Sequence, residues 1–307
     1  MKIGTIRDGA TRLPALIDGD RAYRLDDLLG AMGGVPVTVP DGADAASVLA
    51  TRELAVAARA AAEALPDLIS RGAAPSYPLY SLGPPVSHPG KIVCAGRNYA
   101  DHARELGNDV PTRPILFAKL ASSLRGPFDD VIRPLEVDDL DYEAELCVVI
   151  GTGGRRIPKE RALAHVAGYC CANDVSARNA QLGLGDQWLR GKSFDTFCPI
   201  GPWIVSADEI PDPQALTLRC RVEGSIRQNG TTADMIFDVA TLISYISDAF
   251  TLEPGDLILT GTPSGVAMGQ NPAPWLEPGQ LCEVEIPEIG VIANRIVAEH
   301  RGSTDNG

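Results

Sequence analysis

The chain has no excess of positive charge, no long apolar run and no nucleotide-binding motif. Lys and Arg number 27 against 40 Asp and Glu, and the formal net charge of −13 disfavours nucleic acid and anionic membranes as partners. No apolar segment reaches the length that spans a bilayer, and the N-terminus lacks the apolar core of a signal peptide. We therefore expect a cytoplasmic protein. Neither G-x-G-x-x-G nor a Walker sequence occurs, so a nucleotide is not expected.

The seven cysteines are odd in number and form no C-x-x-C pair. This pattern disfavours a disulfide framework and a thiolate zinc site. We expect most of them to be small buried hydrophobic residues. Thiol catalysis is disfavoured as well, because none of them shows the His partner that a nucleophilic cysteine requires.

The first 85 residues differ in pattern from the rest of the chain. Residues 17–20 predict a hairpin with a type I′ turn, and residues 45–69, rich in Ala, Leu and Glu, predict a helical region. Residues 74–90 are rich in proline, as linkers are. We predict a small N-terminal α/β domain with its linker over 1–85, a larger domain over 86–302 and a frayed tail over 303–307.

From residue 91 onward, short apolar segments alternate with glycine and proline breaks, which predicts a strand-rich α+β domain with long loops. The predicted strands are 91–95, 115–119, 144–150, 166–173, 203–206, 216–222, 256–260 and 281–286. The predicted helices are few and cover 99–106, 159–165, a segment after residue 176, and 238–250.

Acidic residues interrupt a segment that otherwise predicts a buried strand. Residues 141–145 are Asp-Tyr-Glu-Ala-Glu and lead into the apolar residues 146–150. Side chains alternate between the two faces of a strand, so Asp141, Glu143 and Glu145 share one face. Such a pair of glutamates is more often part of a solvated edge strand, but the β-branched run that follows is typical of a strand buried on both faces. Buried carboxylates that lie close together need a cation, and a hard metal ion supplies that charge.

A third carboxylate, Asp174, follows the predicted strand 166–173. It precedes a predicted helix and has two open interpretations, a helix cap or a metal ligand. Together with Glu143 and Glu145 it forms an all-oxygen set that suits Mg²⁺, Mn²⁺ or Ca²⁺. Zinc is disfavoured because no His or Cys lies in these motifs.

Five ordered motifs resemble those of the fumarylacetoacetate hydrolase superfamily, in particular its bacterial two-domain members similar to acylpyruvate hydrolases and 2-hydroxyhepta-2,4-diene-1,7-dioate isomerases. They are 96–102 (GRNYADH), 141–145 (DYEAE), 173–178 (NDVSAR), 191–195 (GKSFD) and 259–266 (LTGTPSGV). The resemblance implies a mixed β-roll catalytic domain with a small N-terminal domain, a homodimer, and a divalent metal held by Glu143, Glu145 and Asp174.

His102 and Glu105 are three residues apart, so a helix brings them to one face, where the carboxylate can fix the tautomer of the imidazole. An isolated pair of this kind is more often a surface feature. The resemblance implies that the pair lies on a lid over the metal and activates water, which makes His102 the candidate general base. It also implies that Lys192 lies beside the metal and faces the substrate. The further residues that the resemblance assigns to substrate binding are Arg178, Gln181, Thr262 and Lys119.

The predicted function is that of a hydrolase that cleaves the C–C bond of an acylpyruvate-like 2,4-diketo acid, a small molecule, through a metal-bound enolate. Mg²⁺ is the expected cofactor, with Mn²⁺ or Ca²⁺ as alternatives. One alternative keeps the metal site but isomerises or decarboxylates unsaturated 2-oxo-dicarboxylates of aromatic catabolism, or decarboxylates oxaloacetate. Another is a metal-binding protein without catalytic activity, and the His102–Glu105 pair argues against it.

Overall fold

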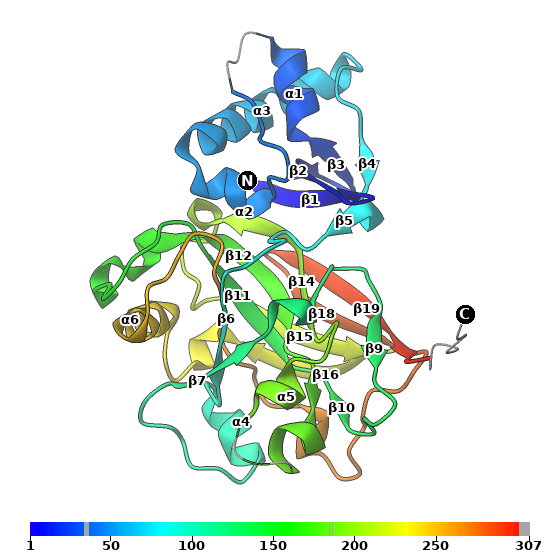
Figure 1. Ribbon diagram of the computed structural model, residues 1–307, viewed down its shortest axis with the longest axis vertical. Helices are drawn as coiled ribbons and strands as arrows, with labels where there is room; N and C mark the ends of the chain where they lie inside the picture. Colours follow the sequence, from blue (N-terminus) through cyan, green and yellow to red (C-terminus); the bar gives the residue numbers. More distant parts are fainter. Residues whose placement is uncertain (34–36, 184, 186, 301–307) are drawn as a thin grey trace, which may run out of the picture.

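The computed structural model describes residues 1–33, 37–183, 185 and 187–300 (Figure 1). Among them, the largest sheet has twelve strands in the order β4-β3-β2-β1-β14-β12-β11-β17-β6-β7, with β5 beside β1 and β8 beside β14. The strands of this sheet are β1 (Lys2–Asp8), β2 (Thr11–Asp18), β3 (Arg21–Arg24), β4 (Tyr77–Pro78), β5 (Leu82–Gly83), β6 (Ile92–Gly96), β7 (Ile115–Lys119), β8 (Leu124–Arg125), β11 (Ala144–Ile150), β12 (Val166–Asn173), β14 (Cys198–Ser206) and β17 (Leu257–Leu259).

A second sheet, of five strands, packs against the large one in the order β16-β15-β18-β19-β9. Its strands are β9 (Val131–Arg133), β15 (Thr217–Val222), β16 (Ser225–Thr231), β18 (Leu281–Ile286) and β19 (Gly290–Ala298). A short antiparallel pair, β10 (Leu140–Asp141) with β13 (Ser176–Ala177), forms a separate two-stranded sheet.

The helices lie at the periphery of the sheets, and α1 to α3 gather in the N-terminal part (Figure 1). They are α1 (Leu25–Met32), α2 (Ala45–Ala50), α3 (Arg52–Ser70), α4 (Ala100–Glu105), α5 (Leu189–Lys192) and α6 (Val239–Ala249). In the part of the chain described here, none of the helices combines the length and the apolar character needed to cross a membrane.

Strand β11 lies inside the large sheet, and all of its residues are buried. Leu146, Val148 and Ile150 belong to the apolar core shared with the second sheet. Cys147 and Val149 point the other way, into the core beneath the N-terminal helices. The alternation confirms the prediction of a strand buried on both faces. The charged side chains of this segment lie at the start of the strand.

The N-terminal strands extend the large sheet, because β1 pairs with β14 through Lys2 opposite Val205 and Ile3 opposite Ile204. An ion pair, with Arg7 Nη2 2.6 Å from Asp129 Oδ1, also joins the N-terminal part to the rest of the chain. The sheet thus continues across the predicted boundary at residue 85, and the division into domains stays a prediction.

The strand-rich α+β class is confirmed, and each of the eight predicted strands overlaps an observed one. The helix predicted after residue 176 is confirmed only in part, because it does not begin at residue 176. The chain forms β13 there and then a short π-helix, Asn179–Gly183. The backbone N–H of Arg178 donates to the carbonyl of Asp139 at 3.3 Å, so pairing with the β10 segment replaces the first helical hydrogen bonds.

Two N-terminal predictions also need correction. The helical region 45–69 is two helices that meet at Thr51, which has an extended backbone with φ −100° and ψ 115°. The hairpin at 17–20 is present, with Asp18 opposite Arg21. Of its two turn residues only Gly19 has a positive φ, 56°, so the turn is not type I′, which requires both.

Candidate active site

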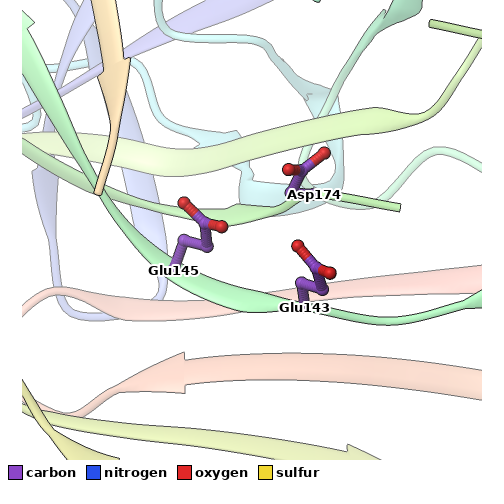
Figure 2. A group of neighbouring side chains, drawn as sticks. All are labelled: Glu143, Glu145 and Asp174. Carbon is purple, nitrogen blue, oxygen red and sulfur yellow. The ribbon is translucent and has the colours of Figure 1, made fainter. Parts of the chain in front are cut away.

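Three buried carboxylates meet where β11 begins and β12 ends (Figure 2). The antiparallel register places Ala144 opposite Asn173. Continued by one residue, it places Glu143 opposite Asp174, and the pleat puts Glu145 on the same face as Glu143. One oxygen from each of the three groups lies within 4.8 Å of the others. The structure therefore brings together the three predicted metal ligands, hereafter the acid triad.

The surroundings of the acid triad act in opposite directions on its two glutamates. Burial raises the pKa of Glu143, but Lys192 and Arg178 outweigh burial and lower it to about 2. Burial and the neighbouring Asp174 and Glu143 raise the pKa of Glu145 well above its usual range. Glu145 accepts a hydrogen bond from the backbone N–H of Gly261 at 2.7 Å and forms no ion pair with any described residue.

Two buried lysines partly neutralise the acid triad. Lys192 Nζ lies 2.7 Å from Glu143 Oε2 and 2.8 Å from Asp174 Oδ2. Lys119 Nζ lies 2.6 Å from Asp174 Oδ1. Lys192 lines a cleft together with Glu143 and Glu145, whereas Lys119 is not among the residues that line it. Burial lowers the pKa of Lys192, but Asp174 and Glu143 outweigh burial and raise it, so this ammonium stays charged.

Arg178 connects the acid triad to Asp141. Its Nη2 lies 2.8 Å from Asp141 Oδ2 and 2.7 Å from Glu143 Oε1, and its Nη1 donates to Gln181 Oε1 at 2.9 Å. Burial lowers the pKa of Arg178, but Asp141 and Glu143 outweigh burial and raise it. The buried cluster holds four acids, Asp141 and the acid triad, and three cations, Arg178 and the two lysines. With all four acids ionised, one negative charge would have no balancing cation in the cluster, in line with the raised pKa of Glu145.

His102 and Glu105 lie on α4, and His102 lines the same cleft. His102 Nδ1 is 3.4 Å from Glu105 Oε2, and the His102 side chain is buried. The Glu105 carboxylate also accepts hydrogen bonds from the backbone N–H of Gly265, at 3.0 and 3.1 Å. The structure thus places the predicted base and its partner next to the acid triad, while their catalytic roles stay predictions.

Thr262 lines the cleft, but its hydroxyl is already hydrogen-bonded within the protein. It donates to the carbonyl of Ala144 at 2.9 Å and accepts from Gln228 Nε2 at 2.8 Å. Gln228 lies on β16, where no strand was predicted. Its Oε1 also accepts a hydrogen bond from the backbone N–H of Ala144 at 2.9 Å. It thereby fixes the start of β11, a role without a local sequence signal because its partners are 34 and 84 residues away.

Arg97 and Trp188 form a wall of the cleft. Arg97 lies in the motif 96–102, but no role was predicted for either residue. Arg97 has a φ of 54°, which is uncommon for a residue other than glycine. Its guanidinium carbon lies 5.5 Å from the centroid of the Trp188 ring. Gly96 permits this arrangement, because a Cβ there would lie 2.5 Å from the Trp188 ring. Arg97 lines the cleft and forms no ion pair within the described residues.

Comparisons with known proteins place this site in a family. The chain matches the family described as Fumarylacetoacetate (FAA) hydrolase C-terminal over residues 91–297. It is 50% identical over 214 residues to the mitochondrial oxaloacetate tautomerase FAHD2A of Bos taurus, across 69% of this chain and 68% of that protein. It resembles the structure of maleylpyruvate hydrolase from Sphingobium sp. SYK-6 in complex with manganese(II) ion and pyruvate, with 31% identity, a TM-score of 0.75, and coverage of 98% of this chain and 100% of that one. A third relative, 2-hydroxyhepta-2,4-diene-1,7-dioate isomerase from Mycobacterium marinum, has 30% identity and a TM-score of 0.71 over 98% of this chain and 100% of that one. The predicted resemblance is confirmed, and the chain belongs to the fumarylacetoacetate hydrolase family of enzymes.

Proposed function

We propose that the protein is a divalent-metal-dependent enzyme that interconverts the keto and enol forms of a small 2-oxo dicarboxylic acid, with oxaloacetate as the candidate substrate. The observation that carries this proposal is the set of residues that line the cleft. Two members of the acid triad, the base of a His–Glu pair and a cation without an ion pair among the described residues line one space. The oxaloacetate tautomerase with 50% identity supports the choice of substrate.

The acid triad fits a divalent cation. Its donor set is all-oxygen, which suits Mg²⁺ or Mn²⁺. With all of its acids ionised, the surrounding cluster would have one negative charge more than its cations balance, and Glu145 forms no ion pair in the described part of the chain. Glu143, Glu145 and Asp174 would hold the ion, which would act as a Lewis acid that polarises the 2-oxo group. The manganese complex of the related hydrolase supports this assignment.

His102 would take and return the proton at the carbon next to the 2-oxo group. Its Nδ1 faces Glu105, and a proton held on Nδ1 leaves Nε2 free to accept. The 3.4 Å distance between Nδ1 and the carboxylate is long for a hydrogen bond, and contacts of this kind shorten when substrate binds. Lys192, charged and buried beside the acid triad, would stabilise the negative charge that develops on the enol oxygen.

Arg97 would bind the second carboxylate of the substrate. Lys192 and Arg178 also line the cleft, but both are engaged by acids of the buried cluster. A guanidinium binds a carboxylate through two parallel hydrogen bonds. The open position of Arg97 therefore favours a dicarboxylic acid over a monocarboxylic one.

The hydrolysis of a 2,4-diketo acid, predicted from the sequence, is the second candidate. The same His102–Glu105 pair would deprotonate water instead of a C–H bond, and the likeness to maleylpyruvate hydrolase supports this reaction. We place tautomerisation first because the identity to the tautomerase is 50%, against 31% for the hydrolase.

The two reactions are separated by incubating the protein and Mn²⁺ with oxaloacetate in D₂O and, in parallel, with a panel of 2,4-diketo acids. If the protein is a tautomerase, the enol form of oxaloacetate decays and C3 takes up deuterium faster than without the protein, and no fragments form. Hydrolysis would instead split a diketo acid into two products, and decarboxylation would release CO₂. His102→Gln is expected to slow tautomerisation by about 100-fold. A wild-type protein that leaves the enol decay of oxaloacetate at its uncatalysed rate with every divalent metal would refute the proposal.

A further inference from the structure

Asp141 is a fully buried acid that lies outside the acid triad. Its carboxylate accepts hydrogen bonds from the backbone N–H groups of Ala267 at 2.7 Å and Met268 at 3.1 Å. It also accepts from Arg178 Nε at 2.8 Å. Asp141 thus attaches one side of the loop 265–269 to the charged network that contains the acid triad.

The other side of the same loop holds Glu105. The backbone N–H of Gly265 donates to both of its carboxylate oxygens, at 3.0 and 3.1 Å. Gly269 lies against the Glu105 side chain, since a Cβ at this position would be 2.4 Å from both Cγ and Cδ of Glu105. The group that a Cβ would meet is a side chain and Gly269 has no positive φ, so an alanine here would displace Glu105 and leave the loop backbone in place.

We propose that residues 265–269 form a clamp that positions Glu105 and, through it, the imidazole of His102, with Asp141 and Gly269 as positioning residues. The arginine that contacts Asp141 also contacts the acid triad, so the clamp and the triad belong to one charged network. The network fixes the base relative to the site where the substrate is held. This inference rests on the proposed function, in which His102 is the base.

The test is a double-mutant cycle in the full-length protein with Mn²⁺ and oxaloacetate. Gly269→Ala is expected to lower kcat by about 10- to 100-fold, as a misplacement of about 1 Å does, while KM and the Mn²⁺ affinity change by less than about twofold. In a Glu105→Ala background the same substitution is expected to have almost no further effect, because both changes act on one contact. Gly30→Ala, where a Cβ meets nothing within 4 Å, is the matched control and is expected to keep the wild-type kcat.

A second readout does not depend on turnover. The ¹⁵N NMR signals of the His102 imidazole, assigned by their loss in His102→Gln, report which ring nitrogen carries the proton. We expect one tautomer, protonated at Nδ1, in the neutral imidazole of the wild type and a mixture in Gly269→Ala. An unchanged tautomer in Gly269→Ala, or an equal loss of kcat with and without Glu105, would overturn the clamp. A wild type without tautomerase activity would refute the proposed function instead, and the tautomer readout would still decide on the clamp.

Discussion

Arg97→Met tests which class of acid the cleft selects. A charge-assisted hydrogen bond contributes about 1.5–3 kcal/mol, which corresponds to about 10- to 150-fold in kcat/KM. Arg97 is only partly buried and rests on Trp188, so water screens its charge and we expect the lower part of this range, about 10- to 30-fold, for oxaloacetate. Pyruvate and 2-oxobutyrate have no second carboxylate, and their slower enolisation is expected to change by less than about twofold.

The assay is deuterium uptake at the carbon next to the 2-oxo group, followed by NMR with Mn²⁺ and each acid in turn. Arg97→Lys keeps the charge without the planar fork, so its loss with oxaloacetate is expected to lie between those of the wild type and Arg97→Met. Arg104→Met is the matched control, because Arg104 lies on α4, the helix that carries His102, but is exposed, and its Nη1 lies 2.7 Å from Asp101 Oδ1. An equal loss with mono- and dicarboxylic acids in Arg97→Met would refute the assignment, since the change would then reflect damage to the wall instead of a lost carboxylate contact.

Glu145→Gln is expected to abolish the rise in melting temperature that Mn²⁺ gives the wild type. It is not expected to lower the stability of the metal-free protein, because burial and the neighbouring acids already disfavour the charged form of Glu145 and a glutamine oxygen can still accept the hydrogen bond from Gly261; calorimetry with and without Mn²⁺ measures both effects. Burial raises the pKa of Asp129, but Arg7 outweighs burial and lowers it. Their ion pair therefore contributes to stability at pH values above the ordinary pKa of an aspartate. This contribution is lost as the pH falls through the lowered pKa of Asp129. We expect Arg7→Met to cost about 0.5–1 kcal/mol at about pH 7 and progressively less as the pH falls through the lowered pKa of Asp129, measured by urea unfolding. Gly191→Ala would place a Cβ 2.3 Å from the backbone nitrogen of Gln181. It is expected to cost about 1–3 kcal/mol and to lower kcat by displacing the neighbouring lysine, and an unchanged melting temperature and kcat would contradict this packing.

The acid triad was predictable because it depends on two local patterns. Glu143 and Glu145 alternate at the start of an apolar strand, and Asp174 ends the next buried strand along the chain. Consecutive strands tend to pair, and antiparallel pairing brings the start of one beside the end of the other. The approach of His102 to Glu105 likewise follows from helical spacing, which needs no knowledge of the rest of the fold.

The parts that were missed depend on contacts between distant segments. Ser176 begins a strand instead of a helix, because the 176–177 segment pairs with Leu140 and Asp141. Tertiary pairing here overrides the local preference that predicted a helix. Gly269 shows the same limit, since nothing near it in the sequence indicates that Glu105, from another part of the chain, fills the space where its side chain would be.

The acid triad alone does not decide the reaction. The similar proteins include a tautomerase, a hydrolase and an isomerase, so family membership fits all three reactions. Polarisation of a 2-oxo group by the metal, and stabilisation of the resulting charge by Lys192, would serve each of them equally. If His102 is the base, as proposed, the difference lies in what meets its Nε2, a C–H bond of the bound acid or a water molecule. Under the proposal, a distal carboxylate held by Arg97 would fix the acid beside this nitrogen and occupy space that a water would need. The choice between tautomerisation and hydrolysis then depends on the wall formed by Arg97 and Trp188, and not on the residues that would hold the metal.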